Sequence, residues 1–109
     1  MIKICARWAL PFALPIAMLT GAVQAQEANE ALLARNLAAT CASCHGTAGI
    51  AQGAMKSLAG RKEEDLLKLL ANYRSGALPA TLMHQVTKGY SEDQLRLIAK
   101  HFAALPAKP

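Results

Sequence analysis

Aromatic residues are scarce in this sequence, and its basic residues form no cluster. Phe, Trp and Tyr make up 5% of the 109 residues. Lys and Arg outnumber Asp and Glu by 12 to 7, which gives a net charge of +5, but they are scattered along the chain. Proteins that bind nucleic acids concentrate basic residues on one surface and often add aromatic side chains on which bases stack. The composition therefore gives no support to a nucleic-acid partner.

The sequence also lacks an apolar run long enough to span a membrane. The apolar stretch near its start, residues 8–19, contains Pro11 and Pro15 and is well short of the roughly 20 residues that a transmembrane helix needs. It follows a short basic start and precedes small residues that end at Ala25. This is the pattern of a secretory signal peptide, and it is favoured over an uncleaved membrane anchor.

Cleavage is therefore expected after Ala25. Residues 1–25 are predicted to be a signal peptide that is removed, and residues 26–109 to form the mature domain. The mature protein is expected in the periplasm, exported and soluble, with no membrane span. A chain of this size has a marginal core of its own, so a bound group is expected to complete it.

Cysteine is rare as well, and its placement is informative. Of the three cysteines, Cys5 lies in the segment expected to be removed, which leaves Cys41 and Cys44. In an oxidising compartment two unmodified thiols so close together would be liable to form a disulfide. A covalent modification that uses both thiols removes this liability.

The two cysteines belong to the motif CASCH, residues 41–45, which is typical of c-type haem attachment. About one helical turn separates the two sulfur atoms, so each thiol can form a thioether with one haem vinyl group. His45 then follows on the proximal face as the fifth ligand of the iron. The motif predicts one covalently attached haem c held by Cys41, Cys44 and His45.

Two other uses of a Cys-x-x-Cys pair compete with haem. A thioredoxin-like dithiol requires the pair at the end of a strand, but no alternation of β-branched residues precedes Cys41. A structural zinc site requires four protein ligands, and here the remaining two would have to come from the scattered His84 and His101. Both alternatives are less favoured than haem.

Three helices are expected in the mature chain, separated by two loops. Residues 27–41 are rich in Ala and Leu, residues 62–75 have three acidic residues in their first turn, and residues 91–105 begin with the capping box of Ser91 and Gln94. Gly76 is the expected C-cap of the second helix. Residues 46–60 and 77–90 are expected to be loops. Phe102 is expected to pack against Leu33 and Leu37 of the first helix.

The remaining coordination of the iron is less tightly determined by the residues alone. A metal-bound His normally donates its second ring N–H to an acceptor, and a backbone carbonyl of the 46–60 loop, at Gly53 or a near neighbour, is expected to accept it. The sixth ligand is to be chosen among four residues: Met55, Met83, His84 and His101. Met83 is favoured because the loop after the second helix can wrap the distal face, and His/Met ligation is the arrangement of cytochromes c.

Taken together, these residues resemble a known family. The mature chain is similar to single-haem class I c-type cytochromes, and within them to the cytochrome subunit of flavocytochrome c sulfide dehydrogenase. The resemblance is carried by ATCASCHG (39–46), SLAG (57–60), YRSG (73–76) and the run from Met83 to Ser91. One departure is QGA (52–54), where family members usually have a Gly-Pro pair whose carbonyl orients the proximal His.

The resemblance implies both a fold and a function. The fold would be all-α, with three main helices and loops wrapped around one haem between His45 and Met83. The partner would be an FAD-containing flavoprotein subunit that oxidises sulfide, so the catalytic chemistry would lie on that chain. This protein would pass electrons from the flavin to a downstream acceptor. The alternatives are a free soluble cytochrome c shuttle and, less favoured, a haem enzyme or gas sensor with an open distal site.

Overall fold

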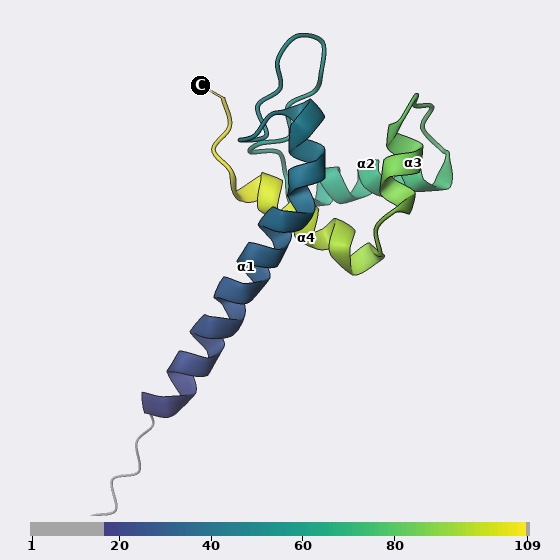
Figure 1. Cartoon of the computed structure of the whole chain (residues 1–109). Helices are drawn as coiled ribbons and strands as arrows, with labels where there is room; N and C mark the ends of the chain where they lie inside the picture. The colour runs from purple at the N-terminus through teal and green to yellow at the C-terminus, as the bar shows by residue number, and fades with distance from the viewer. Residues whose placement is uncertain (1–16, 109) are drawn as a thin grey trace, which may run out of the picture.

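The computed structural model describes residues 17–108 as an all-helical fold, and no strand occurs among them. Figure 1 shows its four helices, which are α1 (Ala17–His45), α2 (Glu63–Ser75), α3 (Met83–Lys88) and α4 (Glu92–Ala104). Helix α4 packs against both α1 and α2, and α3 packs against α2. The all-α class predicted from the sequence is confirmed.

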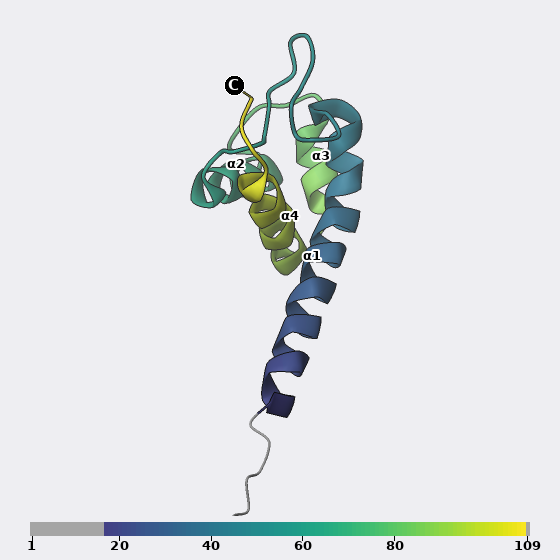
Figure 2. The ribbon, with the colours of Figure 1, turned by 90° about the vertical axis from the view of Figure 1, so that its left-hand side faces the viewer.

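Helix α1 is longer than the sequence analysis predicts. It begins at Ala17 rather than near residue 27, and it continues through the whole CASCH motif to His45. Residues 21–33 are all exposed, and Figures 1 and 2 show the first half of α1 extending away from the other helices. Residues 1–16 of the predicted signal peptide lie outside the described residues. Within residues 17–108, no helix combines the length and apolar character that a membrane span requires.

The ends of α2 and α4 follow the local signals in the sequence. Gly76 ends α2 in the left-handed conformation with φ of 80°, and its N–H donates to the Tyr73 carbonyl. At the start of α4, the Gln94 N–H donates to Ser91 Oγ at 3.2 Å, and the Ser91 N–H donates to Gln94 Oε1 at 2.9 Å. The predicted C-cap and capping box are therefore both confirmed.

Helix α3 corrects the prediction that residues 77–90 form a loop. It is six residues long, and no side chain caps its N-terminus at Leu82. Isolated helices of this length are marginal in water, so packing against α2 must supply much of its stability. Because neither a cap nor an apolar period marks it, the sequence carries little signal for it.

The core is formed where α1, α2 and α4 meet. Its buried members are Ala38, Leu66, Leu95, Ile98, Ala99 and Phe102. On α1 the inner face consists of Ala34, Ala38 and the half-buried Leu37 and Cys41, at the spacing of a helix stripe. Leu37 packs against the core cluster that contains Phe102, whereas the expected packing on Leu33 is wrong, because Leu33 is 49% exposed. Small alanines rather than a second leucine let α4 approach.

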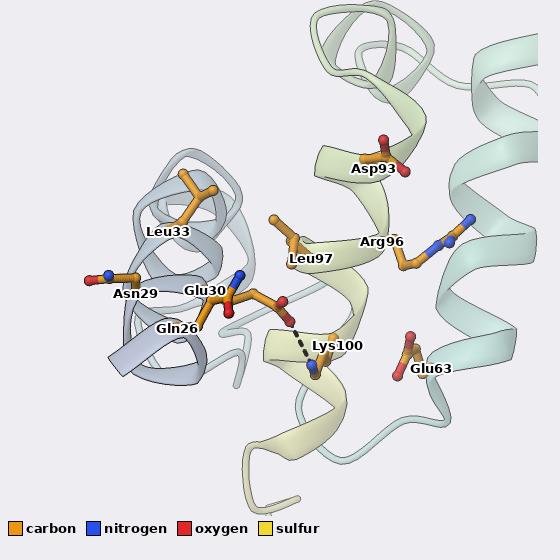
Figure 3. A pocket seen from close by; sticks show the side chains of 9 residues that line it. All are labelled: Gln26, Asn29, Glu30, Leu33, Glu63, Asp93, Arg96, Leu97 and Lys100. Carbon is orange, nitrogen blue, oxygen red and sulfur yellow. Dashed lines mark hydrogen bonds and ion pairs between the residues drawn. The ribbon is translucent and has the colours of Figure 1, made fainter. Parts of the chain in front are cut away.

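An open pocket of about 760 Å³ is lined mainly by residues of α1 and α4 (Figure 3). Lys100 Nζ of α4 and Glu30 Oε1 of α1 form an ion pair there at 2.7 Å, and the hydrogen bond from Lys100 to Glu30 raises the pKa of Lys100. The pair is largely exposed, so it contributes little to the packing of the two helices. None of the predicted site residues lines this pocket.

The packing predicts unequal costs for truncating two apolar residues. Phe102→Ala removes a ring that is 1% exposed and should lower the free energy of unfolding by about 3–5 kcal/mol. Leu33→Ala, the control on the exposed side of α1, should change it by no more than about 0.5 kcal/mol. Urea unfolding of the purified holoprotein measures both. Equal losses would contradict this description of the core.

Candidate haem site

The four predicted site residues line one cavity of about 440 Å³. Cys41, Cys44 and His45 reach it from the end of α1, and Met83 from the start of α3. Figure 1 shows these two helix ends standing apart, so the residues approach the cavity from separate elements. The rest of the lining is mostly apolar and includes Leu58, Leu66, Leu69, Leu70, Val86, Ile98 and Phe102.

His45 is the most strongly fixed of the four side chains. It is 9% exposed, and its Nδ1 lies 2.6 Å from the Lys56 carbonyl oxygen. Because a carbonyl can only accept, Nδ1 must carry the proton, which leaves the lone pair of Nε2 free to bind a metal. The prediction that a carbonyl of the 46–60 loop orients this ring is confirmed, and the acceptor is Lys56 rather than Gly53.

The loop after His45 is folded back by a set of backbone hydrogen bonds. The Gly49 N–H donates to the Gly46 carbonyl at 2.8 Å, and the Leu58 and Ala59 N–H groups both donate to the Gly49 carbonyl. Gly46 has φ of 90°, and a Cβ atom there would overlap the Ile50 carbonyl. A glycine is therefore required directly after His45 for the loop to return Lys56 to the imidazole.

Cys41 and Cys44 differ in their surroundings although both line the cavity. Cys41 is half-buried and Cys44 is exposed, and both thiols are free. Burial raises the pKa of the Cys41 thiol, and the neighbouring Cys44 contributes in the same direction. The Cys41 thiol is therefore neutral at neutral pH, which protects it from oxidation.

Met83 and Met55 both line the cavity, but they lie on different elements. Met55 is 47% exposed and directly precedes Lys56, whose carbonyl binds His45. It therefore belongs to the loop that is held on the His45 side. Met83 is half-buried on α3, away from that loop. A ligand opposite His45 is more readily supplied by Met83.

The two histidines considered as alternative ligands do not line the cavity. His101 lies on α4 with its ring edge-on to Phe102, at 5.3 Å between ring centroids. His84 lies on α3 and has a buried Nδ1. In the described part of the chain no three His, Cys, Asp or Glu residues are grouped to hold a metal ion, so the zinc alternative finds no ligand set there. Cys41 lies within a helix, not after a strand as a thioredoxin-like site requires.

The lining of the cavity fits the requirements of a haem. A porphyrin needs an apolar cleft, and its iron accepts an imidazole nitrogen and a thioether sulfur as axial ligands. The cavity offers an apolar wall, an imidazole with a fixed tautomer, a thioether and two adjacent thiols. Sequence reasoning missed the Lys56 carbonyl because a backbone acceptor leaves no residue-type signature.

Comparison with known proteins agrees with this chemistry. No family model matches the chain. A curated protein of Chlorobaculum tepidum, the "Cytochrome subunit of sulfide dehydrogenase", is 33% identical over 72 residues. The match covers 66% of this chain and 66% of that protein. Together with the helical fold, it shows that the chain is a cytochrome like the cytochrome subunit of sulfide dehydrogenase.

Proposed function

We propose that the chain holds one haem c and transfers electrons. Cys41 and Cys44 form the two thioethers, His45 is the proximal ligand and Met83 is the distal ligand. The observation that carries the proposal is the convergence of these four side chains, and only a few other polar groups, on one apolar cavity. The bound haem supplies the chemistry, a reversible one-electron change at its iron.

The protein's own residues prepare the site for that change. The Lys56 carbonyl holds the imidazole of His45 in one orientation and makes it a better donor. A thioether from Met83 stabilises the reduced iron and raises the reduction potential. The apolar walls from α2 and α4 would shield a bound haem from water.

Export is part of the proposal, with cleavage after Ala25 and a mature domain of residues 26–109 in the periplasm. Support comes from α1, where residues 21–25 are all exposed. Among residues 21–45 of α1 the first buried residue is Ala34, so residues 21–25 contribute nothing to the core.

The proposed partner is an FAD-containing flavoprotein subunit that oxidises sulfide. Support comes from the name of the Chlorobaculum relative and from two exposed apolar side chains on the cavity wall, Met55 at 47% and Leu82 at 58% exposure. An apolar surface beside the redox site suits a stable subunit better than a freely diffusing shuttle, which is expected to carry charged residues there. Sulfide oxidation would then take place on the partner, and electrons would leave to a downstream acceptor.

Replacing Met83 tests the proposal that it occupies the sixth coordination position of the iron. Met83→Ala should open the sixth position, so that the reduced protein binds carbon monoxide and the reduction potential falls. Met55→Ala is the matched control, because it truncates the other cavity-lining methionine and should leave both properties unchanged. Visible spectra and a redox titration give the two readings. Ready binding of carbon monoxide by the unmodified protein would instead indicate a haem enzyme or gas sensor.

Purification of the tagged holoprotein from its own periplasm tests the partner. A flavoprotein should co-purify, and added sulfide should reduce the haem in the complex, as followed by the visible spectrum. A haem protein that is isolated alone and is not reduced by sulfide would contradict the proposed role as a subunit. It would instead indicate a soluble electron shuttle.

A further inference from the structure

The side chain of Thr87 has an unusual environment in this small protein. It has 0% exposure, and among residues 21–108 it and Phe102 are the largest side chains that are fully buried. A buried hydroxyl is costly unless it is hydrogen-bonded, so its partner indicates what holds it in place. Thr87 lies in α3, one helical turn after Met83.

The hydroxyl of Thr87 is directed back to the residue that lines the haem cavity. Its Oγ1 donates to the Met83 carbonyl at 2.9 Å, and the His84 carbonyl lies farther away, at 3.4 Å. Threonines within helices often bond the carbonyl four residues earlier. Here that carbonyl belongs to the first residue of a helix that has no side-chain cap.

The backbone carbonyl of Thr87 accepts hydrogen bonds at the other end of the same helix. It accepts from the Tyr90 N–H at 3.4 Å and from the Gly89 N–H at the C-cap. Thr87 therefore connects the first turn of α3, which bears Met83, to the segment that leads into α4. A six-residue helix has few other bonds with which to keep its first turn closed.

We propose that Thr87 is a positioning residue for Met83, and that its buried hydroxyl keeps the first turn of α3 in the conformation that presents Met83 to the cavity. This inference rests on the proposed function, in which Met83 is the distal ligand. Opening of this turn would withdraw Met83 from the haem. Loss of the hydroxyl therefore increases the fraction of molecules in which the sixth position is free.

Competition by imidazole, an external ligand for the sixth position, measures that fraction. The oxidised holoprotein is titrated with imidazole, and binding is followed by the visible spectrum. Thr87→Val keeps the branched shape but lacks the hydroxyl, and its apparent affinity for imidazole should rise about fivefold, the change expected for one lost hydrogen bond. Thr87→Ser, the matched control, keeps the hydroxyl and should bind imidazole like the unmodified protein.

Unfolding of the same variants in urea separates positioning from general packing. Thr87→Ser loses a buried methyl group and should be destabilised, whereas Thr87→Val keeps that volume. If Thr87 has a purely structural role, the variant with the lower free energy of unfolding will bind imidazole more tightly. If Thr87 positions Met83, the variant without the hydroxyl will bind imidazole more tightly. If Thr87→Val accumulates no holoprotein, Thr87→Ala provides the same comparison with Thr87→Ser.

The outcomes also distinguish this inference from the proposed function. Unchanged imidazole affinity in Thr87→Val, or a rise of the same size in Thr87→Ser, overturns the positioning role while leaving Met83 as ligand. Met83→Ala provides the reference for a fully open site. If Met83→Ala binds imidazole no more tightly than the unmodified protein, Met83 is not the ligand and both proposals fail.

Discussion

The hydrogen bond from His45 Nδ1 to the Lys56 carbonyl connects the two parts of the chain that make the site. It joins the end of α1 to the glycine-containing loop at 2.6 Å, and it is partly buried. A single protonation state of the ring follows from it, because the carbonyl accepts and cannot donate. The position of Nε2 depends on this contact, which also holds the loop that carries Met55 against the end of α1.

The cavity is also a part of the protein core. Leu66, Ile98, Ala99 and Phe102 are core residues that line it as well. Their outer sides pack among the helices and their inner sides face the space proposed for haem. A small chain buries a limited share of its surface by itself, so a bound apolar group would add contacts that the protein cannot make alone. Cofactor binding and folding are therefore expected to be coupled.

Local interactions account for most of what the sequence predicted correctly. Ser91 and Gln94 form their capping box, Gly76 ends its helix, and the CASCH spacing sets three side chains on one helix end. Each of these features depends on residues within about one helical turn of each other, so a single sequence contains the necessary information. The all-α class followed from the same signals.

What the sequence did not predict depends on distant contacts or on the backbone. Helix α3 is stabilised by packing on α2 and by the hydrogen bond from the Thr87 hydroxyl to the Met83 carbonyl. Neither interaction leaves an apolar periodicity or a capping residue in the sequence. The Lys56 acceptor is a carbonyl that any residue could supply. The sequence also predicts Leu33 in the core, but Ala34 and Ala38 are the buried residues of the inner face of α1, where α4 packs.

The mass of the denatured holoprotein is the most direct test of the proposed haem attachment. Thioethers to Cys41 and Cys44 survive denaturation, so the intact chain should carry the added mass of one haem, starting from Gln26. A doubly substituted Cys41→Ala, Cys44→Ala chain should carry none. A mass equal to the bare polypeptide in the unmodified protein, with haem released into acidified acetone, would contradict covalent attachment at this site.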